Sequence, residues 1–131
     1  MSIPEAQYIH ALRSIENIGD GTIRLLIAHF GSGQATWEAS PSDVRAVPKV
    51  STEKKESLIG KRPSIDPVAL WSTLSLGDIV VHTREDATYP RLLREIPDYP
   101  ILLFTRGQLV DFDQPMVSIV GSRKHSSYGE Q

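Results

Sequence analysis

The sequence contains no cysteine, so it can form neither disulfide bonds nor thiolate metal sites. It has no apolar run long enough to cross a membrane, and it does not begin with a basic head followed by an apolar stretch. We therefore expect a cytoplasmic protein that has no membrane partner.

An excess of positive charge is missing as well. The chain carries 14 Lys and Arg against 16 Asp and Glu, which gives a net charge of −2. Residues 1–62 hold eight basic and seven acidic side chains, whereas residues 63–131 hold six and nine. General attraction to nucleic acid is thus absent, and any DNA binding must come from a local site.

Catalytic and metal-binding patterns are also lacking. The acidic residues show no nucleophile, acid–base or metal spacing, and the sequence has neither a Walker loop nor a GxGxxG motif. The four histidines are too far apart in sequence to suggest a zinc site: His10, His29, His82 and His125. The sequence predicts a protein that is not an enzyme and that needs no cofactor.

What the chain does contain is typical of a globular protein, with 40% apolar and 23% charged residues. Its first half has the apolar spacing of short helices. These are expected at about residues 4–15, 23–30, 35–39, 42–47 and 51–59. None is long enough to be stable alone, so they should pack together as one helical domain at 1–62.

The segment KRPSIDP at 61–67 is the best domain boundary because it carries two prolines. After it, Asp66 and Pro67 should begin a helix that ends near Gly77. Short β-rich runs then follow at 78–83, 101–105 and 116–120, with a helical turn at 91–95. The apolar run MVSIV at 116–120 suits the centre of a parallel sheet. We therefore predict an α plus α/β protein, in which residues 63–131 begin a Rossmann-like α/β domain.

Two tight turns resemble those of a helix-hairpin-helix element, where outward-facing backbone amides hold a DNA phosphate. The first is Asn17 to Thr22 and the second is Val47 to Ser51. Asn17 and Lys49 occupy the position of the usual glycine. Asp20 places a carboxylate beside the first turn, which should oppose anion binding. The alternative is that both turns are ordinary αα-hairpins that serve packing.

The strongest functional pattern follows the run at 116–120. A strand that leads through Gly-Ser-Arg into a helix start is the arrangement in which α/β sheets bind phosphates. Gly121 would let the backbone approach a ligand, while the other predicted phosphate-binding residues would donate hydrogen bonds or charge. These residues are Gly121, Ser122, Arg123, Lys124 and Ser126.

Several blocks of the second half resemble the DNA-processing protein A (DprA/Smf) family. They are Tyr89-Pro90-x-x-Leu93-x-x-Ile96-x-Asp98-x-Pro100-x-Leu102, then Gly107, then Ile119-Val120-Gly121-Ser122-Arg123-x-x-Ser126-x-Tyr128-Gly129. The resemblance is clear over residues 66–131 and loose over the helical half. It implies a helical, sterile-alpha-motif-like or hairpin-type domain followed by a Rossmann-like domain.

The same resemblance implies a function. The family binds single-stranded DNA, protects incoming DNA during natural transformation in competent cells, and helps to load the recombinase RecA in DNA recombination. It also implies that the protein forms homo-oligomers. The chain would then be the front part of a longer protein, and it ends just after the Gly-Ser-Arg loop. The alternative is a Rossmann-type enzyme or sensor that binds a phosphorylated nucleotide at that loop.

Overall fold

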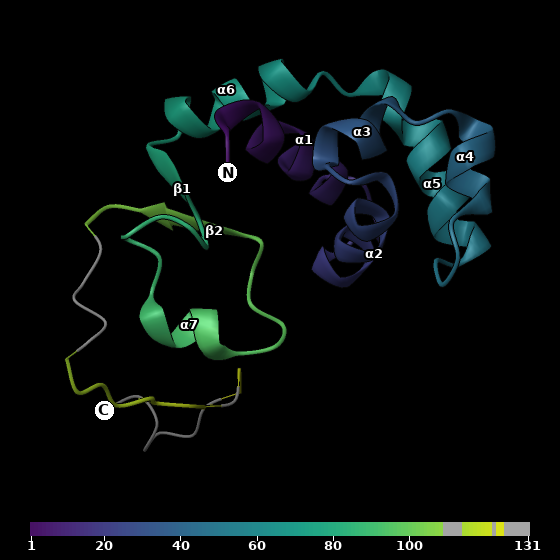
Figure 1. The fold of residues 1–131 in the computed structure, drawn as a ribbon. Helices are drawn as coiled ribbons and strands as arrows, with labels where there is room; N and C mark the ends of the chain where they lie inside the picture. The colour runs from purple at the N-terminus through teal and green to yellow at the C-terminus, as the bar shows by residue number, and fades with distance from the viewer. Residues whose placement is uncertain (109–113, 122, 125–131) are drawn as a thin grey trace.

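The computed structural model describes residues 1–108, 114–121 and 123–124. Six α-helices form the upper part of the molecule in Figure 1, and two strands with one further helix form the lower part. The elements of the upper part are α1 (Ile3–Arg13), α2 (Asp20–Phe30), α3 (Gly33–Glu38), α4 (Pro41–Ala46), α5 (Thr52–Lys61), the 3-10 turn η1 (Arg62–Ser64) and α6 (Pro67–Leu76). The lower part comprises β1 (Ile79–Thr83), α7 (Arg91–Glu95) and β2 (Leu102–Arg106).

Local capping signals set several helix ends. The carboxylate of Asp66 accepts hydrogen bonds from the backbone N–H groups of Val68 and Ala69 at 2.9 and 3.2 Å, so α6 begins where predicted. Gly31 adopts a left-handed φ of 95° and ends α2. The fourth helix begins one residue earlier than the predicted range of 42–47, because Ser40 caps it by accepting from the N–H of Asp43 at 3.1 Å. Pro41 then occupies the first helical position, which suits its fixed φ.

One apolar core runs through the helical part and into the sheet. Ile9, Leu12, Ile23 and Leu26 are almost fully buried between α1 and α2. Core residues of the other elements pack with them: Val44, Val47, Val50, Leu58, Ile101 and Leu102. Trp37 and Trp71 pack against this cluster, as expected of core anchors.

The sheet consists of β1 and β2, which pair antiparallel with Val81 opposite Phe104. Residues 115–121 form no strand, so the strand predicted at 116–120 is a wrong prediction. Within the described residues, no strand lies beside this run to accept its backbone hydrogen bonds. Its side chains consequently face solvent, and Ile119 is 96% exposed. The described part is thus mostly helical with a small two-stranded sheet, which is compatible with an α plus α/β class.

The helical and β parts are in direct contact. Helix α6 packs along α1, and β2 also contacts α1. Ile101 and Leu102 belong to the same core as the helices of residues 1–62. The division at residues 62 and 63 stays a prediction, and the core passes across it. Among the described residues, no helix is both long and apolar enough to cross a membrane.

Candidate nucleic-acid interface

The two predicted hairpin turns share an unusual backbone conformation. Asn17 has φ 67° and Lys49 has φ 63°, so both are left-handed. These are the two positions where a helix-hairpin-helix turn has glycine. Asparagine tolerates this conformation, whereas for lysine it costs about 1–2 kcal/mol. The backbone at Lys49 is therefore strained, because lysine has no intrinsic preference for this conformation.

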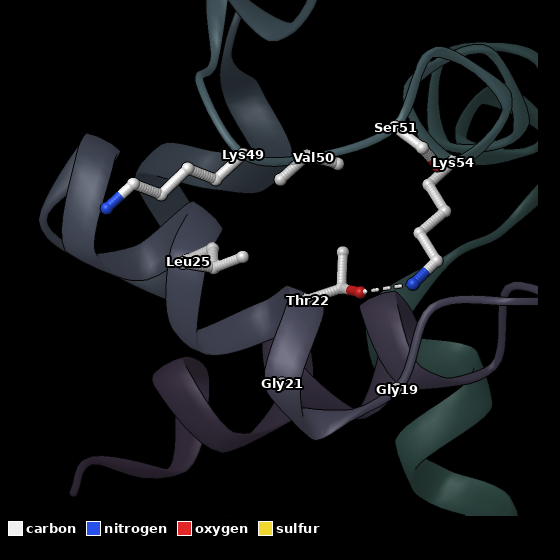
Figure 2. Close-up of a pocket in the computed structure, with 8 residues that line it drawn as sticks. All are labelled: Gly19, Gly21, Thr22, Leu25, Lys49, Val50, Ser51 and Lys54. Carbon is white, nitrogen blue, oxygen red and sulfur yellow. Dashed lines mark hydrogen bonds between the residues drawn. The ribbon is translucent and has the colours of Figure 1, made fainter.

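Tertiary packing brings the two turns to opposite sides of one pocket of about 610 Å³ (Figure 2). The first turn and α2 supply one wall, and the second turn and α5 supply the other. The lining residues are Gly19, Gly21, Thr22, Leu25, Lys49, Val50, Ser51 and Lys54. Two of them are cationic and none is a carboxylate, so the pocket attracts anions.

The helices at this pocket differ from most others in how they begin. Side chains of Ser2, Ser32, Ser40 and Asp66 cap α1, α3, α4 and α6. No side chain caps α2, which follows Gly19, or α5, which follows Ser51. Both uncapped ends lie at the pocket, and their partial positive charge adds to that of the lysines.

Asp20 does not oppose an anion in the way the sequence suggested. Its carboxylate forms an ion pair with Arg13 and accepts a hydrogen bond from the backbone N–H of Ile101 at 3.0 Å. It is absent from the pocket lining, although Gly19 and Gly21 on either side of it are present. Its charge is therefore directed to the end of α1 and the start of β2.

The two lysines reach the pocket from different sides. In Figure 2 they flank Val50, with Leu25 and Thr22 on the facing wall. The ammonium of Lys54 donates a hydrogen bond to the hydroxyl of Thr22 at 3.1 Å. Sequence reasoning identified Lys49 but missed Lys54. A lysine in the first turn of α5 was a usable signal, because helix N-termini disfavour cations.

The predicted Gly-Ser-Arg loop is described in part. Gly121, Arg123 and Lys124 are exposed, while Ser122 and Ser126 lie outside the described residues. A Cβ on Gly121 would meet no atom within 4 Å, so the space around it does not require glycine. Figure 1 shows residues 114–121 on the α7 side of the molecule, apart from α2, α4 and α5. The loop and the hairpin pocket are therefore separate features.

The Tyr-Pro block has a structural role. Tyr89 is 2% exposed, and its hydroxyl donates a hydrogen bond to the carbonyl oxygen of Pro100 at 2.8 Å. Burial raises the pKa of the Tyr89 hydroxyl, with the neighbouring Tyr99 a smaller contribution. His82 is held between the hydroxyls of Thr88 and Thr105, each at 2.8 Å. These bonds join the loop around α7 to both strands.

Within the part of the chain that the structure describes, no three His, Asp or Glu side chains come close enough to hold a metal ion. The chemistry available at the hairpin pocket is that of lysine ammonium groups, a threonine hydroxyl and backbone amides. Such groups bind anions, including phosphate.

Comparison with known proteins shows which protein family this chain resembles. The model of the DNA recombination-mediator protein A family matches residues 80–131, which include the Tyr-Pro block and the Gly-Ser-Arg loop. No solved structure matches the chain.

Two curated relatives extend the similarity to the helical part. Protein Smf of Synechocystis sp. is 28% identical over 135 residues, which is 100% of this chain and 34% of the relative. Protein Smf of Escherichia coli is 32% identical over 126 residues, or 92% of this chain and 31% of the relative. The chain resembles the DprA/Smf family over its whole length, and it spans about a third of the length of these relatives.

Proposed function

We propose that this chain is part of a single-stranded-DNA-binding protein that protects incoming DNA and assists RecA loading in natural transformation and recombination. The proposal includes no catalysis and no cofactor, and it includes homo-oligomers. Similarity to the DNA recombination-mediator protein A family supports a role in DNA recombination. The observation that carries the DNA-binding part is the pocket in which two hairpin turns and two lysines face one another.

The pocket has the properties that a nucleic-acid backbone requires. Its volume of about 610 Å³ is within the range of small-ligand sites. Lys49 and Lys54 supply positive charge, and the starts of α2 and α5 supply backbone donors. Contacts of this kind hold phosphates without reading bases. We therefore propose sequence-independent binding at the hairpin pocket.

The Gly-Ser-Arg loop is proposed as a further phosphate site of the same protein. Gly121, Ser122, Arg123, Lys124 and Ser126 would form it. Its exposed Arg123 presents a planar guanidinium that can hold two phosphate oxygens. The same loop could serve a phosphorylated nucleotide in a Rossmann-type enzyme or sensor, which is the alternative function.

Binding of labelled oligothymidylate, measured by fluorescence anisotropy, tests the proposal at the pocket. Lys54→Ala should weaken binding by about 10- to 100-fold, since a charge-assisted contact contributes roughly 1.5–3 kcal/mol. Lys55→Ala is the matched control, because Lys55 donates to the carbonyl oxygen of Arg45 at 2.8 Å and does not line the pocket. Equal affinities of the two variants would remove the pocket from the DNA site.

A second experiment separates the alternative function. Arg123→Ala should also lower affinity for oligothymidylate by about 10-fold or more. A thermal-shift panel of nucleotides on the wild-type protein should show no stabilisation. Stabilisation by one nucleotide, together with unchanged DNA binding of Arg123→Ala, would favour the enzyme or sensor.

A further inference from the structure

Two arginines from different elements contact the ring of Tyr99, in the segment that leads into β2, and the main chain of a third is bonded to one of them. The guanidinium carbons of Arg24, on α2, and Arg84, after β1, lie 4.5 and 4.3 Å from the centre of the Tyr99 ring. Arg94, on α7, is next to them, because the side chain of Arg84 donates to its carbonyl oxygen at 3.0 Å. We call Arg24, Arg84, Arg94 and Tyr99 the arginine cluster.

The cluster has no internal charge compensation. Arg24 donates to the carbonyl oxygen of Tyr99, and Arg94 donates to that of Asp86. The side-chain hydrogen bonds of all three arginines thus go to neutral main-chain oxygens. Among the described residues, none of the three arginines forms an ion pair with a carboxylate within 4 Å.

Nearby carboxylates are engaged elsewhere. Asp20, one turn before Arg24 on α2, is paired with Arg13. Glu95, beside Arg94 on α7, is paired with Arg91 at 3.0 Å. Glu85, beside Arg84, faces the N-terminal amine at 3.7 Å. The sequence therefore places these three acidic residues beside the cluster, and the fold directs them to other cations.

Like charges are held close together as a result. The distances to the Tyr99 ring place the guanidinium carbons of Arg24 and Arg84 no more than 8.8 Å apart. That separation is about one Debye length at physiological ionic strength, so the two charges repel each other. The buried Nε of Arg94 has no hydrogen-bond acceptor among the residues that the structure describes. A bound anion would offset this repulsion.

The geometry also fits a phosphate group. Each guanidinium has five N–H donors in a planar fork that matches phosphate oxygens. Stacking on Tyr99 orients the forks of Arg24 and Arg84, while each uses one nitrogen for its hydrogen bond to the main chain. Preorganised arginines beside an aromatic ring are the combination found in single-strand-binding grooves.

We propose that the arginine cluster binds the phosphodiester backbone of single-stranded DNA, at a site separate from the Gly-Ser-Arg loop. The choice of DNA as occupant rests on the proposed function. Helix α2 contributes residues to both sites, since Thr22 and Leu25 line the hairpin pocket and Arg24 belongs to the arginine cluster.

Arg84→Ala tests the proposal, because Arg84 is exposed and its loss leaves the apolar core intact. The affinity for labelled oligothymidylate should fall about 10-fold or more. The slope of log affinity against log salt should flatten by about 0.7, the value for one contact to a single strand. Arg91→Ala is the matched control: Arg91 is an exposed arginine of α7 that pairs with Glu95, and its removal should leave affinity unchanged.

The outcomes separate this site from the function on which it rests. If wild-type protein binds no DNA, both proposals are wrong; if it binds and Arg84→Ala binds equally well, this site alone is wrong. Should Arg84→Ala melt early, Arg84→Gln retains a donor for the carbonyl oxygen of Arg94 and replaces it in the assay. Polyglutamate that binds the wild-type protein but not Arg84→Ala, with equal DNA affinity in both proteins, would instead assign the cluster to an acidic protein partner and overturn the proposal.

Discussion

The carboxylate of Asp20 accepts a hydrogen bond of 3.0 Å from the backbone N–H of Ile101, although 81 residues separate them in sequence. The same carboxylate pairs with Arg13 at the end of α1. One side chain thus joins both helices of the first hairpin to the segment that enters β2. Its position also keeps its negative charge out of the hairpin pocket.

Asp20→Ala should therefore destabilise the fold. It leaves the backbone N–H of Ile101 without its acceptor and Arg13 without its partner. The free energy of unfolding should fall by about 1–3 kcal/mol, as measured by urea denaturation. Glu16→Ala, at an exposed position in the same turn, should change it by less than about 0.5 kcal/mol. Equal stability of the two variants would show that the Asp20 bonds contribute nothing.

Tyr89→Phe tests the structural role of the Tyr-Pro block. The variant keeps the buried ring and removes the hydroxyl that donates to the carbonyl oxygen of Pro100. A loss of about 0.5–1.5 kcal/mol in unfolding free energy is expected. Tyr8→Phe is the control, because the Tyr8 ring contacts Trp37 and its hydroxyl forms no hydrogen bond within the described part of the chain. DNA affinity should not change in either variant.

Stability should also depend on the titration of His10. Burial, and secondarily the charge of Arg13, lowers the pKa of His10 below 6.5 in the folded protein. At pH values below 6.5, the folded state then binds fewer protons than the unfolded state. The contribution of neutral His10 to the free energy of unfolding is therefore fully present above pH 6.5 and is lost as the pH falls through the folded-state pKa. Its ring contacts Trp71 and Phe104, where a charged imidazole is disfavoured.

Urea denaturation at a series of pH values checks this expectation. In the wild-type protein, the free energy of unfolding should decrease as pH is lowered from 6.5. His10→Phe keeps an aromatic ring between Trp71 and Phe104 and should flatten this dependence. His29→Gln, at an exposed position, should retain it. A pH dependence that survives in His10→Phe would assign it to other groups.

Lys49→Gly separates strain from binding. Glycine adopts the left-handed φ of 63° without steric cost, so the variant should gain about 0.5–1 kcal/mol of stability after its higher unfolded-state entropy is counted. The loss of an ammonium group from the pocket should at the same time lower DNA affinity several-fold. Lys61→Ala, outside the pocket, should leave the affinity unchanged. A more stable variant with full affinity would show that Lys49 does not serve DNA binding.

Local sequence signals determined most of the helices. Asp66 with Pro67 begins α6, and Gly31 ends α2, because capping bonds form within one turn and need no partner from elsewhere. The two tight turns were also recognisable, since residues at 17 and 49 must adopt a left-handed conformation for the chain to reverse there. The Gly-Ser-Arg pattern stays a prediction from sequence.

Tertiary structure alone decided how these parts meet. The pocket exists because α2 and α5 face each other. The apolar pattern of either helix does not show which other helix lies opposite it. The side chain of Arg24 donates to the carbonyl oxygen of Tyr99, 75 residues away in sequence, and no short-range pattern predicts such a contact. For the same reason the apolar run at 116–120 was misread: its composition favours a strand, but a strand needs a neighbour to complete its hydrogen bonds, and the described residues offer none.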